Sequence, residues 1–305
     1  MSGNSERKLE KLHNEYSGER IFIIGNGPSL TKTQLSRLDS EYTFALNKIN
    51  AMYDAVSWRP SFYLFMKSTI NDEEREYIKE NINNGSVCFL NEDYRSTFAN
   101  QENTYYITRK KLAADPLTVA NISVSDIDNL DVSELLDVWE SDITTGVYKQ
   151  HSMYPILQIV SYLGFDEVYL LGCDLGFDVQ KPYLLFESGV DPAKFIKKKE
   201  FFKSSLRNHT PVRSILNAVL FKLMLTRPVG YLLEQVTSLY EDDSHFTESY
   251  DNKIRFKDVN TEISNAHRVA KRVLNAEGVT VYNATPGGEL EVYPRVDFDT
   301  IVNGS

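Results

Sequence analysis

Residues 25–30, Gly-Asn-Gly-Pro-Ser-Leu, are the stretch whose residue types offer the most chemistry. They follow the apolar run at 21–24, so the glycines stand where a buried strand should end and allow the backbone close to a ligand. Amides at the start of a following helix favour a phosphate, although neither a Walker loop nor a GxGxxG fingerprint is present. Two interpretations stay open, a nucleotide or phosphate site and a plain turn with a serine cap. The residues concerned are Gly25, Asn26, Gly27, Pro28 and Ser29.

His245 lies in the acidic, polar run Asp-Asp-Ser-His-Phe at 242–246. A histidine with a pKa near neutrality suits a general base that takes a proton from a sugar hydroxyl, and a neighbouring carboxylate would orient it. The alternative is a solvated loop histidine without a role. A functional role is harder to dismiss for two other histidines, because His151 lies near the Thr-Thr-Gly turn and His209 lies in a basic segment.

Thr144, Thr145 and Gly146 precede a predicted buried helix and offer hydroxyl and amide donors to a phosphate or carboxylate. The threonines serve equally well as caps of that helix. Asp174 ends a predicted strand, where it suits a metal or a ribose hydroxyl, or caps the following turn.

The elements that would position these residues alternate between strand and helix patterns, which predicts an α/β fold with a mainly parallel, Rossmann-like sheet. Asn26, Asn47 and Asp174 fall at the carboxyl ends of predicted strands, where ligands bind in such sheets. The expected strands are residues 21–24, 42–46, 61–66, 86–90, 104–108, 167–174 and 280–282. The expected helices are residues 5–18, 146–165, ending at a Gly164 cap, and 262–276.

The composition excludes several classes of protein. A chain of 305 residues with a net charge of -10 is a poor nucleic-acid binder. Two cysteines, Cys88 and Cys173, provide neither a disulfide framework nor a zinc site, and we expect ordinary buried thiols. The polar N-terminus lacks the apolar stretch of a signal peptide, and no window reaches the roughly 18 apolar residues of a spanning helix. We therefore expect a cytoplasmic protein.

Residues 194–227 are locally basic and carry the apolar spacing of an amphipathic helix. Three interpretations stay open: contact with the inner surface of a membrane, a lid over an anionic ligand, and a packing helix. We expect an α/β domain of residues 1–176 and 241–305 with a helical lid insertion at 177–240.

Five stretches together resemble the bacterial sialyltransferases of glycosyltransferase family 42. They are IFIIGNGPSL (21–30), ALNK (45–48), ITTGVY (143–148), LGFDEVYLLGCD (163–174) and SHF (244–246). Two further stretches, SHFTESY (244–250) and YNATPGGELEVYPR (282–295), resemble the wider DUF115 family, whose members include pterin pyrophosphokinase-like and flagellin-glycosylation proteins.

The sialyltransferase resemblance implies a variant glycosyltransferase-A fold in which Asn26 and Asn47 contact the CMP part of a CMP-sugar. It implies that Thr145 and Gly146 line the donor site and that His245 is the general base, without a metal. Lys48 stands where those enzymes have a glutamine, and Asp142 where they have an arginine. Of two tyrosines that stabilise the departing phosphate, one position holds Gly176, and Tyr183 is a loose candidate for the other.

The sequence thus predicts an inverting transferase that moves a sialic-acid-like or other acidic sugar from a CMP-activated donor to a glycan or glycolipid. We expect this transferase to need no cofactor. One alternative is an ATP- and Mg²⁺-dependent pyrophosphokinase acting on a hydroxymethylpterin, with Asp142 and Asp174 as metal ligands. Another is a non-catalytic nucleotide-sugar-binding protein. The sequence leaves open whether the chain forms a homo-oligomer.

Overall fold

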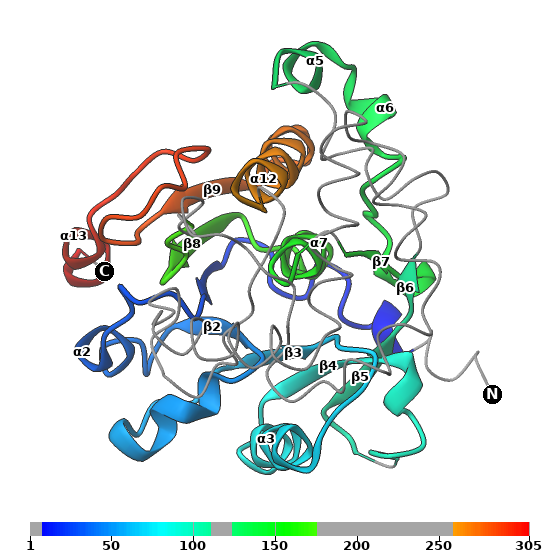
Figure 1. The fold of residues 1–305 in the computed structure, drawn as a ribbon, viewed down its shortest axis with the longest axis vertical. Coiled ribbons are helices and arrows are strands. Elements are labelled where there is room, and N and C mark those ends of the chain that lie inside the picture. The colour runs from blue at the N-terminus through cyan, green and yellow to red at the C-terminus, as the bar shows by residue number, and fades with distance from the viewer. Residues whose placement is uncertain (1–7, 100, 111–123, 150, 176–258, 305) are drawn as a thin grey trace, which may run out of the picture. The chain divides into compact units, whose positions relative to one another are not determined.

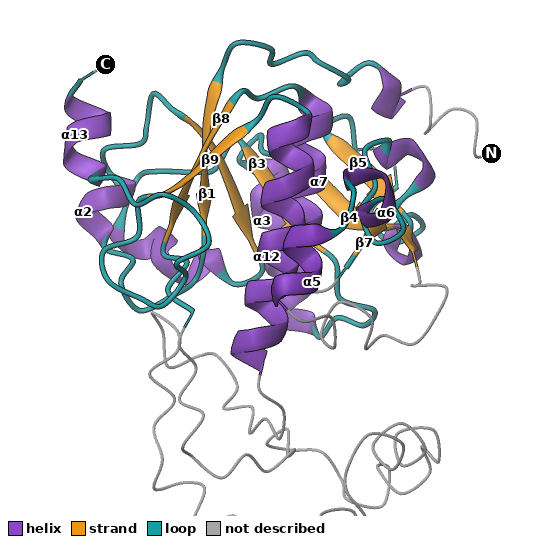
Figure 2. Cartoon of the chain, turned by 90° about the horizontal axis from the view of Figure 1, so that it is seen from above, coloured by secondary structure: helices purple, strands orange, loops and turns teal. Residues whose placement is uncertain are grey.

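The computed structural model describes residues 8–99, 101–110, 124–149, 151–175 and 259–304. These residues belong to one compact unit in which helices cover both faces of a central sheet (Figures 1 and 2). The predicted α/β class with a Rossmann-like sheet is confirmed. The predicted insertion at 177–240 lies outside the described residues and stays a prediction.

The sheet has seven strands within the described residues, all parallel, in the order β5-β4-β3-β2-β1-β8-β9. Their bounds are β1 Arg20–Ile24, β2 Tyr42–Leu46, β3 Phe62–Phe65, β4 Val87–Asn91, β5 Thr104–Ile107, β8 Glu167–Leu171 and β9 Thr280–Asn283. Six of these strands lie within one residue of their predicted ranges at each end, and β8 ends three residues before its predicted end. Parallel strands buried on both faces are continuously apolar, which explains why short apolar runs located them.

Alternate side chains of each strand enter two separate cores. Ile21 and Ile23 of β1 face one core, while Phe22 and Ile24 face the other, and all four are fully buried. The fold is therefore three layers deep, with the sheet between two layers of helices.

The first core is covered by α5 Val124–Asn129, α6 Val132–Leu135, α7 Tyr154–Leu163 and α12 Val259–Ala276. The second is covered by α2 Lys32–Leu35, the 3₁₀ turns Ile49–Ala55 and Glu92–Tyr94, α3 Asp72–Asn83 and α13 Phe298–Asn303. A pair of short strands, β6 Arg109–Lys110 and β7 Val147–Tyr148, forms a second, two-stranded parallel sheet.

The predicted helix at 146–165 is wrong in its first half, because α7 begins only at Tyr154, with Pro155 in its first turn. The preceding residues are held elsewhere, since β7 pairs with β6 and the Gln158 side chain bonds both backbone groups of Tyr148. Gly164 does end the helix, in the left-handed conformation (φ 91°).

The predicted helix at 5–18 is also wrong beyond its start, because residues 11–18 form turns. The amides of Asn14 and Tyr16 donate to the carbonyls of Tyr162 and Leu163 at the end of α7. These contacts satisfy carbonyls that the helix end leaves open, so tertiary bonding replaces a local helix. Within the described part of the chain, no helix has the length and apolar character needed to cross a bilayer.

Candidate functional site

The carboxyl ends of β1 and β8 meet where the chain order of the sheet reverses. From β1 the chain builds β2 to β5 on one side, and later β8 and β9 on the other. The Gly25 amide donates to the carbonyl of Leu171 (2.7 Å) and the Gly27 amide to that of Gly172 (2.9 Å). In open α/β sheets, ligands bind at such a switch point, which makes this edge the candidate site.

The glycines of the turn are required by a close approach within the chain. A Cβ atom on Gly27 would overlap the Asp174 carboxylate and lie 2.7 Å from the carbonyl oxygen of Gly172. A Cβ on Gly25 would likewise overlap that carbonyl. From the sequence, these glycines would let a ligand come close to the backbone. In the structure, residues 172–174 of the chain itself lie at that distance.

Asp174 lies over the same turn and accepts hydrogen bonds from Ser29. The Ser29 hydroxyl donates to its Oδ2 at 2.9 Å, and the Ser29 amide lies 3.5 Å from the same atom. Partial burial raises the pKa of the Asp174 carboxyl, and the bonds from Ser29 oppose that shift. An internal carboxylate therefore lies against the turn in which the sequence suggested a phosphate site.

Ser29 is not the helix cap that the alternative interpretation expected. Thr31 is the N-cap of α2 and forms a capping box with Gln34, at 3.3 and 2.9 Å. Since α2 has four residues, the turn leads into no substantial helix. Ser29 instead links the turn to Asp174.

The loop after β9 forms a third wall of the edge. The Thr285 hydroxyl accepts from the Cys173 amide (3.0 Å), and the Glu289 amide donates to the Asp174 carbonyl (2.6 Å). Arg295 fixes this loop by donating to three of its carbonyls, those of Thr285 (3.1 Å), Gly287 (2.5 Å) and Gly288 (2.8 Å). The backbone of Asp174 is therefore held on both sides.

Asn26, Asn47 and Lys48 lie together at the ends of β1 and β2. The Asn26 amide donates to the Leu46 carbonyl at 3.2 Å. Asn47 adopts the left-handed conformation (φ 52°), and Lys48 is buried with its Nζ 3.7 Å from the Glu73 carboxylate. This part of the predicted donor site is brought together as the sequence suggested.

Thr144, Thr145 and Gly146 are placed elsewhere. Both threonine hydroxyls donate to Asp142, at 2.7 and 3.0 Å. Gly146 abuts the Thr108 carbonyl beyond the end of β5. Since β5 lies four strands from β1, about 19 Å separates these ends. The threonines do not cap α7, whose N-cap is Met153.

The chain after Gly146 then crosses the carboxyl edge of the sheet, and we call residues 146–149 and 151–153 the edge strap. Lys149 donates from Nζ to the Met66 carbonyl after β3 (3.1 Å), and Met153 Sδ lies 3.5 Å from the Cys173 thiol after β8. Lys149 thus reaches the carboxyl edge at the end of β3, a placement that no local sequence signal indicated.

His151 of the edge strap, which is partly exposed, lies against the buried His267 of α12. The rings of His151 and His267 are 4.7 Å apart, and His267 Nδ1 lies 3.0 Å from the Tyr293 hydroxyl. Burial lowers the pKa of His267 to about 3. Burial, then the charges of His267 and Lys149, lowers the pKa of His151 well below its usual value. Both imidazoles are therefore neutral at pH 7.

His245, the predicted general base, and Tyr183 lie outside the described residues, as do His209 and residues 194–227. Their roles stay predictions. Among the residues that the structure does describe, no group of three or more His, Cys, Asp or Glu side chains has the arrangement of a metal site. Cys88 and Cys173 are buried free thiols whose pKa burial raises.

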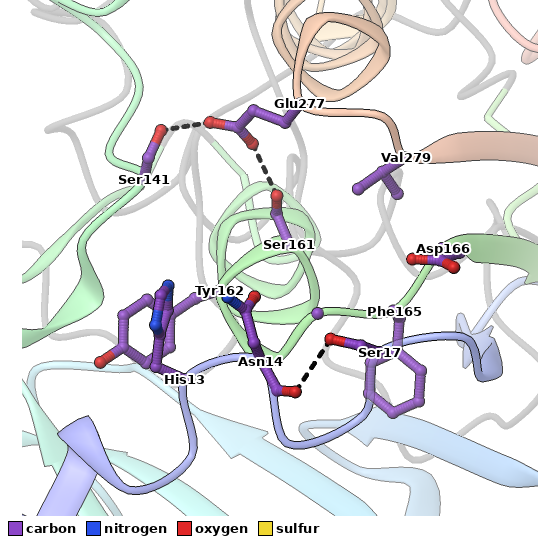
Figure 3. Close-up of a pocket in the computed structure, with 11 residues that line it drawn as sticks. His13, Asn14, Ser17, Ser141, Ser161, Tyr162, Phe165, Asp166, Glu277 and Val279 are labelled. Atoms are coloured by element: carbon purple, nitrogen blue, oxygen red, sulfur yellow. Dashed lines mark hydrogen bonds between the residues drawn. The ribbon is translucent and has the colours of Figure 1, made fainter.

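A cavity of about 320 Å³ lies at the opposite, amino edge of the sheet, beside the residues that precede β8 and β9 (Figure 3). Its Glu277 carboxylate accepts from the hydroxyls of Ser141 and Ser161 (2.6 Å for Ser161), and both serines point toward it. None of the predicted site residues lines this cavity. We place the candidate site at the carboxyl edge, where strand order and predicted residues agree.

No family model and no curated protein matches the chain, so neither family named above is shown. Among solved structures, the chain is similar to the MAf glycosyltransferase from Magnetospirillum magneticum AMB-1, at 12% identity and a TM-score of 0.40. The match covers 98% of this chain and 39% of that one, so the chain spans about two fifths of that protein's length.

Proposed function

We propose that the chain is a glycosyltransferase that binds a nucleotide-activated sugar at the carboxyl edge of its sheet. The observation that carries the proposal is the switch point between β1 and β8, where Asp174 lies over the turn after β1. Asn26 and Asn47 follow the adjacent strands β1 and β2. Amide groups and a half-buried carboxylate suit the base and the ribose hydroxyls of a nucleotide.

The proposed donor is a CMP-activated sialic-acid-like or other acidic sugar, as the sequence resemblance implies. In the proposed reaction, an acceptor hydroxyl of a glycan attacks the anomeric carbon and its proton passes to His245. The bond from that carbon to the phosphate oxygen breaks, CMP leaves, and the configuration inverts. The described residues contribute nucleoside binding, through Asp174 and the two asparagines.

A thermal-shift screen with CMP, CDP, UDP, GDP and ATP tests the nucleotide class. A ligand at 100 times its Kd stabilises the folded chain by about 2.7 kcal/mol, and we expect that effect from CMP. Stabilisation by ATP with Mg²⁺ alone would contradict the proposal and favour the pyrophosphokinase.

CMP release from CMP-sialic acid then tests the chemistry. We expect turnover to be lost in His245→Ala and weakened through KM in Asp174→Asn, whereas His13→Ala, an exposed residue outside the site, stays like wild type. CMP binding without transfer to any glycan acceptor would indicate a binding protein instead.

A further inference from the structure

Two cations from different parts of the chain converge on the three residues that follow β3. Arg109 of β6 donates from Nη1 to the Ser68 hydroxyl at 3.3 Å. Lys149 of the edge strap donates to the Met66 carbonyl at 3.1 Å. Met66 is buried and Ser68 is exposed, so the point of convergence opens to solvent at the carboxyl edge.

Other cations along this edge have carboxylate partners. Lys67 pairs with the buried Glu74, and Lys110 with Glu140. Arg109 instead bonds to a neutral hydroxyl, and none of the described carboxylates forms an ion pair with it. Its fork of donors is suited to an oxyanion.

The turn after β1 has the opposite character. There the Asp174 carboxylate already accepts from the hydroxyl and lies near the amide of Ser29. An anionic ligand placed at this turn would meet a like charge at short range, which is unfavourable in a partly buried position. The two halves of the edge therefore differ in sign.

We propose that Arg109, Lys149 and the Ser68 hydroxyl form a subsite for a phosphate or diphosphate group over the carboxyl end of β3. The glycine turn at 25–29 is not the anion site. Only the assignment of this group to the sugar donor rests on the proposed function; the anion subsite itself does not. Asp174 contacts the turn after β1, and two strand spacings, about 10 Å, separate the ends of β1 and β3, so a nucleotide would span from this turn to the subsite.

The positive charge of Lys149 affects a neighbouring histidine, which supports the position of its ammonium group at the carboxyl edge. It lowers the pKa of His151, after the larger effects of burial and of His267. The Lys149 ammonium group therefore lies near enough to His151 to disfavour a second positive charge on that imidazole.

Calorimetric titration with inorganic pyrophosphate tests the subsite. We expect Arg109→Gln and Lys149→Gln each to weaken binding about tenfold or more, and Arg109→Lys to weaken it less. Lys79→Gln is the matched control, because it removes the same charge from the exposed Lys79–Glu76 pair on α3. The control should bind pyrophosphate like wild type.

The subsite is overturned if wild type does not bind pyrophosphate, if neither glutamine variant weakens binding, or if Lys79→Gln weakens it equally. Thermal melting of each variant checks folding, and Arg109→Lys keeps the test valid should a glutamine variant melt early. Titration with CMP separates the two proposals. CMP binding that is unchanged in both glutamine variants, while their pyrophosphate binding is weakened, contradicts the assignment of the subsite to the donor phosphate but not the anion subsite. Pyrophosphate binding without any nucleotide binding contradicts the proposed function alone.

Discussion

The Asp174 carboxylate accepts a 2.9 Å hydrogen bond from the Ser29 hydroxyl and thereby joins the end of β8 to the turn after β1. The two residues are far apart in sequence, and each has a simpler local role available as a cap. Their contact closes the switch point and gives this part of the carboxyl edge a negative charge.

Removal of the Ser29 hydroxyl should raise the pKa of Asp174 further. The bond from Ser29 stabilises the carboxylate and opposes the effect of burial, so Ser29→Ala leaves burial unopposed. Hydrogen bonds to charged groups are stronger than those between neutral groups, so we expect a measurable upward shift of the Asp174 pKa. Carboxyl ¹³C titration by NMR measures it. Ser36→Ala, which removes an exposed hydroxyl on α2, should leave the titration of Asp174 unchanged.

Gly27→Ala should destabilise the fold. The new methyl group would overlap Asp174 and press on the Gly172 carbonyl, and such overpacking typically costs about 1–3 kcal/mol. Urea denaturation measures the loss. The double variant Gly27→Ala/Asp174→Ala should recover part of it, since one of the two obstacles is removed. If Gly27→Ala were as stable as wild type, the close contact described at the switch point would be contradicted.

The strands and the carboxyl-edge position of Asn26, Asn47 and Asp174 could be predicted from sequence. Each strand is a short apolar run followed by turn residues, and a buried parallel strand needs nothing more to be recognised. The contacts that these residues make with one another at the carboxyl edge could not be predicted. The approach of Asp174 to Gly27 depends on how β8 pairs with β1, which local patterns do not encode.

The same reason explains why the positions of Thr144–Gly146 and Lys149 in the fold could not be predicted from sequence. Residues 146–153 follow a sequence pattern that leads into a helix, yet pairing of β7 with β6 keeps the first of them extended. The resemblance placed Thr145 and Gly146 in a donor site, whereas the chain brings Lys149 to the edge instead. Long-range pairing of two-residue strands has no distinct sequence signal.

Acid should destabilise the fold through His151 and His267. An unfolded histidine takes up a proton near pH 6.5, but the folded groups do so only at much lower pH, about 3 for His267. Between these values the unfolded state binds more protons, so this stabilisation is complete above about pH 6.5 and declines by up to about 1.4 kcal/mol per pH unit for each histidine as pH falls.

Denaturant unfolding at several pH values from 7.5 to 4.5 measures that slope. The groups facing the pair are Lys149, Tyr154 and Tyr293, and burial raises the pKa of both tyrosines, so neither ionises in this range. His267→Gln should be less stable at pH 7.5 but lose less on acidification. An equal slope in wild type and His267→Gln would contradict the buried, neutral state of His267, and His13→Gln serves as the exposed control.

Arg295 should control the loop that supports Asp174. Its guanidinium bonds to the carbonyls of Thr285, Gly287 and Gly288, a fork that lysine cannot reproduce, so Arg295→Lys should lose about 1–3 kcal/mol of stability. Hydrogen exchange should rise at residues 285–289, including the Glu289 amide that donates to Asp174. Arg95→Lys is the control, because the Arg95 guanidinium donates to the neighbouring Glu92 side chain, beside β5 at the other end of the sheet from β9. Faster exchange in Arg295→Lys at the loop, with β1 and β2 still protected, would show that Arg295 acts on the third wall locally. Unchanged exchange at 285–289 would instead mean that Thr285 and Glu289 hold the loop against β8 without Arg295.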